Sequence, residues 1–204
     1  MSFPDAYFTV KFSHQIILKE RGSKFLAFIF HVTSESDIKN QLDLIKKEHP
    51  AANHYCYAWR LGADKSAFRA YDDGEPNNTA GKPILGQIQA HDLTNVLIVV
   101  VRYFGGTLLG TGGLIQAYKT SAAQVIAGAH IFEKFILFEY QINFNEENIN
   151  LVMRILKDNQ AKIISHTYDK SNSIVFQVKK QNSIKLEKDF TDLYSSKLSY
   201  LKTI

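Results

Sequence analysis

The sequence predicts an α+β protein with two domains. Strand-like and helix-like apolar patterns alternate along the chain, and a glycine-rich turn directly follows the wholly apolar run 96–101. After residue 130 the pattern changes to a compact series of short elements. The length of 204 residues allows one large domain or two small ones. We therefore expect domains at 1–130 and 131–204.

The composition is that of a folded protein in a reducing compartment. Hydrophobic residues make up 45% of the chain and charged residues 22%, which is ordinary for a globular protein. Cys56 is the single cysteine, so no intramolecular disulfide can form. The N-terminus shows no signal-peptide pattern, and the run 96–101 is far shorter than the roughly 20 residues of a membrane helix. We expect a cytoplasmic protein without membrane contact.

The net charge of +4 is spread evenly along the chain. Residues 1–130 contain 13 Lys and Arg against 11 Asp and Glu, and residues 131–204 contain 11 against 9, so each part carries +2. Non-specific nucleic-acid binding usually requires a strongly basic module. Any contact with RNA must therefore come from a local patch.

The first domain begins with strands and a helix. Segment 7–32 is rich in β-branched and aromatic residues and is broken by a polar stretch at 20–23, which predicts an antiparallel hairpin. Ser34 stands three residues before Asp37, which resembles the start of a capping box. Pro50 is expected to end the helix that starts there.

The remainder of this domain alternates between strand and helix. We expect a strand at 55–60, a loop at 72–82 and a short helix after Pro83. The run 96–101 lacks polar alternation and predicts a central strand that is buried on both faces. A closely packed helix with small residues is expected around 114–125.

The second domain has the order β-α-β-β-α-β, which is the ferredoxin-like arrangement. The expected elements are a strand at 135–144, a helix at 149–156, strands at 163–168 and 173–178 around a polar turn at 169–172, a helix at 186–194 and a strand at 198–201.

The glycine-rich turn is the first candidate site. Gly105, Gly106, Gly110, Gly112 and Gly113 lie between strand and helix, where backbone N–H groups and the helix dipole can hold an anion. The spacing fits neither a Walker loop nor a dinucleotide fingerprint. The alternative is architectural, since glycines let the chain turn tightly against neighbouring backbone.

Arg102 and the acidic residues form the second candidate group. Arg102, next to Tyr103 and Phe104, suits phosphate binding or base stacking, or it pairs with an acid of the loop 72–75. Asp72, Asp73 and Glu75 could chelate a cation or act as acid and base, but no further ligand lies at suitable spacing. A solvated loop is the favoured interpretation.

The histidines, the cysteine and an aromatic stripe are expected to have structural roles. His49 and His54 lack companions for a zinc site, so each is expected to be a hydrogen-bonded structural residue. Cys56 lies inside a strand and is expected to be a buried, inert thiol. Tyr55, Tyr57 and Trp59 share one face, which either stacks RNA bases or forms part of the core.

Four sequence blocks resemble the YigZ/IMPACT family. The blocks are RGSKF at 21–25, AANHYCYA at 51–58, DDGEPNNTAGKP at 72–83 and VRYFGG at 101–106. The resemblance implies an N-terminal domain with the fold of some ribosomal proteins and of domain IV of elongation factor G. It also implies a ferredoxin-like C-terminal domain. Family members are linked to regulation of translation, and nucleic-acid binding is suspected for bacterial members.

Three positions depart from the family pattern. Leu108 stands where the family's glycine turn usually carries lysine, and Gln116 stands where its helix usually begins with arginine. Both changes remove a cation beside the proposed anion site. Asn78 replaces a frequent glycine but tolerates similar backbone angles.

These observations lead to one main expectation and two alternatives. We expect a translation-associated regulator that binds RNA or the ribosome, with a protein of the translation machinery as a further candidate partner. The alternatives are a small hydrolase of a phosphorylated or peptide substrate and a protein-binding scaffold. No catalytic residue, metal or cofactor is predicted. The candidate anion- or nucleic-acid-binding residues are Lys82, Arg102, Tyr103, Gly105, Gly106, Gly110, Gly112 and Gly113, and the candidate functional loop consists of His54, Asp73 and Glu75.

Overall fold

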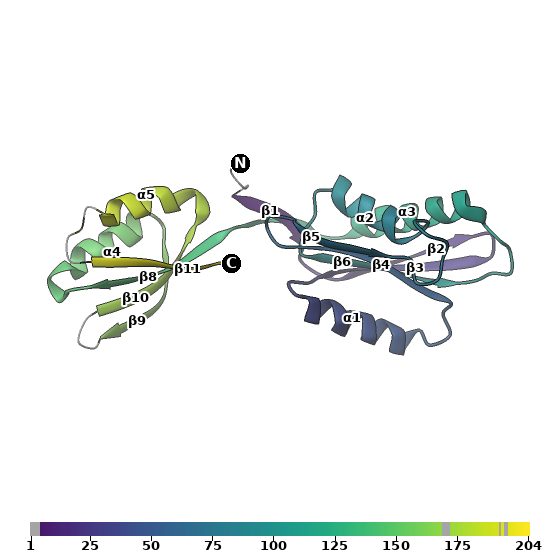
Figure 1. Cartoon of the computed structure of the whole chain (residues 1–204), viewed down its shortest axis with the longest axis horizontal. Coiled ribbons are helices and arrows are strands. Elements are labelled where there is room, and N and C mark those ends of the chain that lie inside the picture. Colours follow the sequence, from purple (N-terminus) through teal and green to yellow (C-terminus); the bar gives the residue numbers. More distant parts are fainter. Residues whose placement is uncertain (1–4, 169–171, 192, 194–195) are drawn as a thin grey trace. The chain divides into compact units, whose positions relative to one another are not determined.

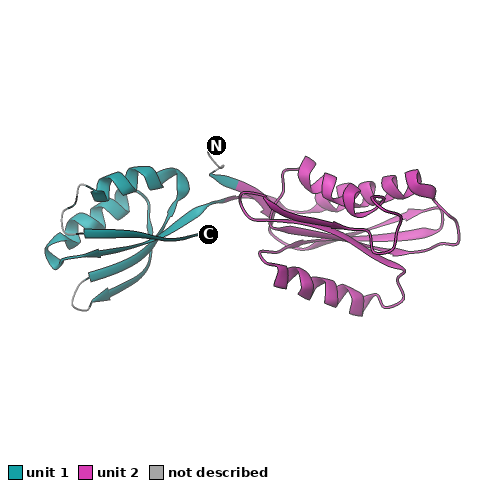
Figure 2. Cartoon of the chain, in the orientation of Figure 1, with its two compact units in different colours: residues 1–6, 135–204 teal, residues 7–134 magenta. Residues whose placement is uncertain are grey.

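Strands and helices alternate through the whole described chain, as the sequence predicts for an α+β protein. The structure, a computed structural model, describes residues 5–168, 172–191, 193 and 196–204. Within these residues it contains three antiparallel sheets and five α-helices (Figure 1). The chain divides into two compact units (Figure 2). Unit 2 comprises residues 7–134, and unit 1 comprises residues 135–204 together with the N-terminal residues up to Ala6.

Unit 2 is built on a five-stranded antiparallel sheet with the order β2-β3-β6-β4-β5. The strands are β2 (His14–Glu20), β3 (Ser23–His31), β4 (His54–Leu61), β5 (Ala67–Tyr71) and β6 (Val96–Tyr103). The residues from Val96 to Val101 have no exposed surface, because β6 is the middle strand and both faces of the sheet are covered. The predicted central strand is confirmed.

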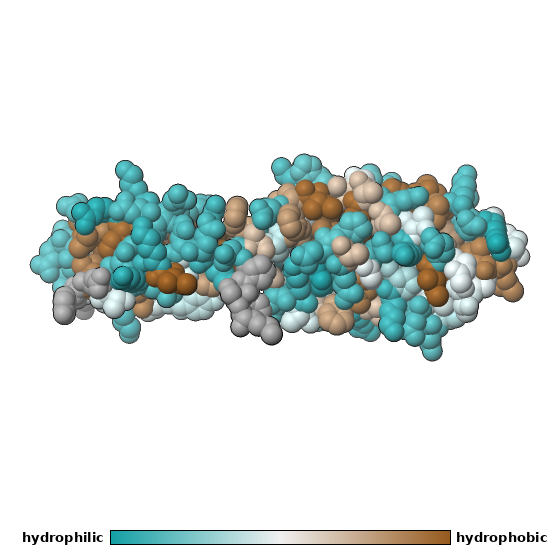
Figure 3. Space-filling model, turned by 90° about the horizontal axis from the view of Figure 1, so that it is seen from above, coloured by the Kyte–Doolittle hydropathy of each residue, from teal (hydrophilic) through white to brown (hydrophobic). Residues whose placement is uncertain are grey.

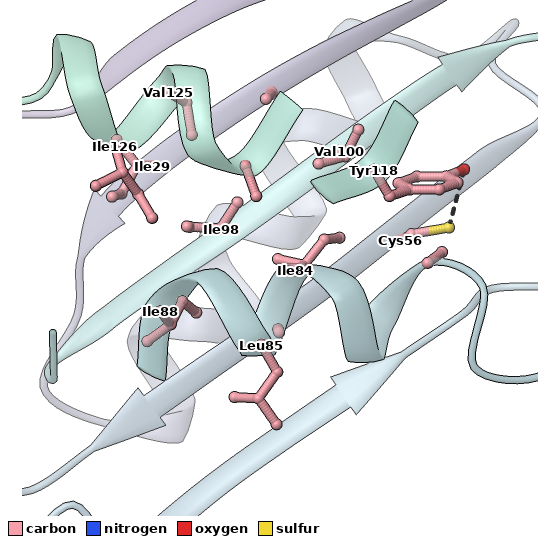
Figure 4. Packing of buried hydrophobic residues seen from close by; sticks show 14 of the residues in the cluster. Ile29, Cys56, Ile84, Leu85, Ile88, Ile98, Val100, Tyr118, Val125 and Ile126 are labelled. Atoms are coloured by element: carbon pink, nitrogen blue, oxygen red, sulfur yellow. Dashed lines mark hydrogen bonds between the residues drawn. The ribbon is translucent and has the colours of Figure 1, made fainter. Parts of the chain in front are cut away.

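Helices cover both faces of this sheet (Figure 1). Helices α2 (Gly81–Ala90) and α3 (Gly110–Gly128) lie on one face, and α1 (Glu35–Glu48) lies on the other. On the first face, side chains of α2 and α3 pack against β3, β4 and β6 in one apolar cluster (Figure 4). A second cluster lies beneath α1 and contains Phe28, Trp59 and Val99. The faces of β6 therefore contribute to two separate cores.

Helix α1 begins and ends near the predicted residues. The Ser34 hydroxyl accepts a hydrogen bond from the Asp37 amide at 3.1 Å, and the Asp37 carboxylate accepts one from the Ser34 amide at 3.1 Å. This reciprocal capping box satisfies N–H groups that the first helical turn cannot pair internally. The helix ends at Glu48, two residues before Pro50.

Unit 1 has the predicted β-α-β-β-α-β order. Its elements are β8 (Leu137–Phe144), the short 3-10 helix η1 (Glu146–Asn148), α4 (Ile149–Asp158), β9 (Lys162–Tyr168), β10 (Asn172–Lys179), α5 (Lys180–Thr191) and β11 (Ser196–Thr203). The sheet order is β11-β8-β10-β9. Residues 169–171 of the predicted polar turn, and Tyr194 of the predicted helical stripe, lie outside the described residues.

Several elements differ from the prediction. The segment 7–32 is not one hairpin: β2 and β3 form the hairpin, while β1 (Ala6–Val10) pairs with β7 (Ile131–Phe135) in a separate two-stranded sheet. Strand β5 was not predicted, and α2 begins at Gly81, two residues before Pro83. Among the described residues, no helix combines the length and apolar character needed to cross a membrane.

Candidate functional site

The glycine-rich turn connects the end of β6 to the start of α3. Three of its glycines, Gly110, Gly112 and Gly113, belong to the first turn of α3 and not to a loop before it. Leu109 occupies the N-cap position and provides no side-chain hydrogen bond to the helix. The first N–H groups of a helix have no partner within the helix. In α3, a helix of 19 residues, these N–H groups therefore lack the hydrogen bond that an N-cap side chain usually supplies.

Different structural constraints apply to the individual glycines of the turn. A Cβ atom at Gly105 would lie 1.9 Å from the Gly22 carbonyl carbon, so Gly105 is needed for close approach of two backbones. Gly106 and Gly110 have φ angles of +86° and +71°, which L side chains rarely adopt. A Cβ atom at Gly112 would meet nothing within 4 Å. Architecture thus explains Gly105, Gly106 and Gly110 but not Gly112.

Arg102 is buried at the end of β6 and is paired with the acidic loop. Its Nη1 donates to Glu75 Oε1 at 2.7 Å, and both side chains are less than a tenth exposed. Its guanidinium carbon lies 5.4 Å from the ring centre of Phe25 and 5.6 Å from that of Phe104. Arg102 Nε is buried and has no hydrogen-bond partner among the described residues. Of the two roles considered for Arg102, the structure shows the pairing, and Glu75 is the partner.

Glu75 also anchors a chain of buried hydrogen bonds. Its Oε1 accepts a second hydrogen bond from the Tyr118 hydroxyl at 2.7 Å. The Cys56 thiol lies 3.3 Å from that hydroxyl (Figure 4) and 2.9 Å from the Asp72 carbonyl oxygen. Burial raises the pKa of Tyr118 and the pKa of Cys56, and nearby Glu75 adds to both shifts. Cys56 is therefore a buried, neutral thiol, as expected.

The interpretation of a solvated loop is wrong for Glu75, whose side chain is buried, while Asp72 and Asp73 are half-buried. The Asp72 carboxylate accepts hydrogen bonds from the amides of Asn78, Ala80 and Gly81, with distances of 2.8 to 3.0 Å. The Asp72 carboxylate thereby caps the start of α2, where the N-cap residue Ala80 provides no side-chain hydrogen bond. The Asp73 carboxylate accepts one from the Tyr55 amide at 2.7 Å. Backbone N–H groups that need acceptors hold this loop against the sheet.

His54 joins the loop to the site. Its Nδ1 lies 2.8 Å from the Asp73 carbonyl oxygen. Because a carbonyl oxygen only accepts, Nδ1 carries the proton, as a structural histidine would. His54 Nε2 lies 3.9 Å from Glu75 Oε1, at the same carboxylate that pairs with Arg102.

These residues meet at a pocket of about 490 Å³. The surface that is open to the pocket is almost entirely apolar. The lining residues are Asn53, His54, Glu75, Pro76, Arg102, Phe104, Leu108, Leu109, Gly110, Thr111 and Leu114. The pocket thus brings together His54 and Glu75 of the candidate loop, Arg102 and the start of α3, whereas Asp73 is not among its lining residues. The sequence analysis did not predict that leucines line the pocket. The pair Leu108-Leu109 between glycines was nevertheless a visible signal of apolar residues in a turn.

Other candidate residues lie elsewhere. Tyr103 faces the α1 side of the sheet, where its hydroxyl lies 3.0 Å from His49 Nδ1. This follows from the alternation of side chains along β6, which places Tyr103 and Arg102 on opposite faces of the sheet. Trp59 is buried in the cluster beneath α1, which supports the core interpretation of the aromatic stripe. Lys82 is exposed at the second residue of α2 and does not line the pocket.

Comparison with known proteins now identifies the family. A family model described as the Impact N-terminal domain matches residues 21–126. IMPACT family member YigZ of Escherichia coli is 34% identical over 155 residues, which cover 75% of this chain and 76% of YigZ. An IMPACT family member of Haemophilus influenzae is 31% identical and covers 87% of each chain. The chain belongs to the IMPACT family.

The fold of this IMPACT-family chain also occurs in a solved structure. The crystal structure of a hypothetical protein is 28% identical, has a TM-score of 0.74 and covers 98% of both chains. All residues that line the pocket lie between 53 and 114, inside the matched Impact N-terminal domain.

Proposed function

We propose that this IMPACT-family protein is a translation-associated regulator that binds RNA or the ribosome through the glycine-rich turn of unit 2. The observation that carries the proposal is the start of α3, where helix N–H groups without a side-chain cap adjoin a pocket and the open position Gly112. The family resemblance supplies the link to translation and to nucleic acid.

The fold supports the proposal by analogy. The strand order β11-β8-β10-β9 and the β-α-β-β-α-β sequence of unit 1 support a ferredoxin-like assignment. For unit 2, we infer the ribosomal-protein and elongation-factor-like fold from the family resemblance. Analogy of fold alone does not establish function, so the decisive test is at the site itself.

Electrostatics at the turn set the expected strength of binding. The Arg102 charge is balanced by Glu75, and the family resemblance implies that Leu108 and Gln116 occupy positions where a cation is usual. The α3 dipole adds an attraction for phosphate, equivalent to about half a charge at the helix start. We therefore expect moderate affinity for RNA and a shallow dependence on salt.

The two alternative functions have less support in the structure. A hydrolase that uses Glu75 would need its carboxylate, but Oε1 already accepts from Arg102 and Tyr118. A scaffold would present a continuous exposed apolar surface. On the face shown in Figure 3, hydrophobic patches are interrupted by hydrophilic residues in each unit.

Substitutions at Leu108 test the proposal directly. The side chain is 82% exposed, so neither Leu108→Lys nor Leu108→Glu disturbs the core. In filter binding with a mixed-sequence single-stranded RNA at about 50 mM salt, we expect Lys to tighten binding severalfold and Glu to weaken it severalfold. Both effects should shrink at about 200 mM salt, because screening reduces the interaction.

A matched control lies in unit 1. Ile184 on α5 is 80% exposed, and Ile184→Lys and Ile184→Glu introduce the same charges in the other unit. These variants should bind RNA as the wild type does. Equal affinities for both Leu108 variants, or equal effects at Leu108 and Ile184, would show that the turn is not the binding surface.

A further inference from the structure

We propose that the open face of the four-stranded sheet in unit 1 binds the phosphate backbone of single-stranded RNA without reading its sequence. This inference rests on the proposed RNA binding and adds a second contact surface, in the other unit. Three observations carry it: the strand register that defines the face, the separation of charges between the two sides of the unit, and the lack of aromatic side chains at the paired positions of the face.

Helices α4 and α5 cover only one face of this sheet. Along β10, buried and half-buried side chains alternate, because successive residues of a strand point to opposite faces. The buried residues Ile174, Phe176 and Val178 belong to the apolar cluster that α4 and α5 complete. Figure 1 shows both helices on the same side of the sheet. The opposite face therefore has no described helix of unit 1 over it, as in antiparallel sheets with one solvated face.

The strand register gives the composition of this open face. Directly paired residues of an antiparallel sheet point to the same side, so each row of partners can be followed from one edge strand to the other. Two rows consist wholly of polar residues: Lys197, Asn143, Ser173 and Thr167 form one, and Lys202, Glu139, Gln177 and Lys162 form the other. The face is thus polar across all four strands and carries lysines on both edge strands, β11 and β9.

The charges of unit 1 are separated between its two sides. The face carries one carboxylate, that of Glu139, against four lysines at positions 162, 179, 197 and 202. The other described acidic residues of 135–204 belong to η1, α4 and α5. Lys162 and Lys197 are exposed and form no ion pair within the described chain. The net charge of +2 for residues 131–204 therefore conceals a local basic patch, which RNA binding by this chain requires.

The middle of the face decides which part of the RNA it contacts. RNA-binding modules with a comparable four-stranded sheet stack bases on aromatic residues of that sheet. Here the central strands β8 and β10 present Gln141 and Val175, and no paired position of the face carries an aromatic ring. The attraction then comes from lysine charge, which acts on phosphate whatever the base. The edge strands are about 14 Å apart, so an extended strand that crosses the sheet meets lysines on both.

The test measures binding of oligo(A) and oligo(U) of about 12 nucleotides to the full chain by fluorescence anisotropy, between about 50 and 200 mM salt. We expect Lys162→Gln/Lys197→Gln to weaken binding of both RNAs about tenfold at the lower salt concentration. The slope of log affinity against log salt concentration should become shallower by about 1.4, because each lost phosphate contact removes about 0.7. Lys162→Arg/Lys197→Arg keeps both charges and should retain binding.

A matched control lies on the helix side of the same unit. Lys185 and Lys188 of α5 are exposed, and Lys185→Gln/Lys188→Gln changes the net charge by the same amount. This variant should bind both RNAs as the wild type does. Equal losses in the two glutamine variants would show that only net charge matters, and would overturn the inference.

The outcomes separate this surface from the glycine-rich turn. If the sheet variant binds as the wild type does while the Leu108 variants change binding, the inference fails and the proposed function stands. If the sheet variant weakens binding and the Leu108 variants have no effect, the inference holds and the turn is not the contact. A preference for one RNA that the sheet variant abolishes would overturn binding without sequence reading. If the wild type binds neither RNA at low salt, both proposals fail.

Discussion

The carboxylate of Glu75 is a buried acceptor on which several elements converge. It receives hydrogen bonds from Arg102 at the end of β6 and from Tyr118 on α3, and His54 of β4 lies beside it. Removing one partner of a buried ion pair leaves an uncompensated charge, which costs far more than the pair contributes. One oxygen atom of Glu75 therefore links the loop both to the sheet and to α3, in addition to the hydrogen bonds that Asp72 and Asp73 accept.

We expect Arg102→Met to lower the free energy of unfolding by about 3–5 kcal/mol, because Glu75 would remain buried without its cation. The double variant Arg102→Met/Glu75→Gln removes both charges and keeps an acceptor for Tyr118, so it should recover a large part of that loss. Urea unfolding of the wild type, both single variants and the double variant measures the coupling. Strictly additive losses would show that the pair is not coupled.

At this scale the sequence left pairing with an acid and anion binding as two alternative roles for Arg102, and it did not identify the partner. Asp72, Asp73 and Glu75 were equivalent candidates for Arg102. Which acid pairs with Arg102 depends on backbone N–H groups that only folding brings close. The amides of Ala80 and Gly81 donate to Asp72, and the Tyr55 amide donates to Asp73. Glu75 remains for Arg102. The pocket likewise depends on residues distant in sequence, which no local pattern connects.

Among elements, the glycine-rich turn combines a structural and an open part. Gly105 allows the turn to lie against the β2–β3 connection at Gly22, where the backbones are too close for a Cβ atom. Gly112 lies in the first turn of α3 with free space around it and without a positive φ angle. The two positions therefore allow the architectural role of the turn to be separated from binding.

We expect Gly105→Ala to destabilise the protein strongly, because its Cβ would overlap the Gly22 backbone. Gly112→Ala should raise the melting temperature, since alanine is favoured over glycine in a helix by about 1 kcal/mol. Thermal unfolding followed by circular dichroism compares the two substitutions directly. Equal melting temperatures for both variants would contradict the close approach at Gly105.

The elements that sequence reasoning identified are those with strong local patterns. The buried strand β6 and the capped helix α1 carry their signals within a few residues. Strand β5 is an exposed edge strand without a buried face, so it lacks alternation. Strand β1 pairs with β7, which lies more than 120 residues away in the chain, and this long-range pairing overrides the local resemblance to a hairpin.

For the whole molecule, the apolar cores follow the two units. The clusters on either side of the five-stranded sheet contain only residues of unit 2. The remaining cluster, formed by α4, α5 and their sheet, contains only residues of unit 1. A unit that contains its complete core can fold alone, and stability increases with the fraction of surface that is buried.

We therefore propose that the units are independent domains and expect the fragment 7–134 to fold without unit 1. Heteronuclear NMR of this fragment should reproduce most of the amide resonances of the full chain, and its urea unfolding should be cooperative. The fragment 135–204 is smaller and loses the backbone hydrogen bond between the Ile136 amide and Asp5, so it should be the less stable piece. An unfolded 7–134 fragment, or a single unfolding transition of the full chain that neither fragment reproduces, would contradict independent folding.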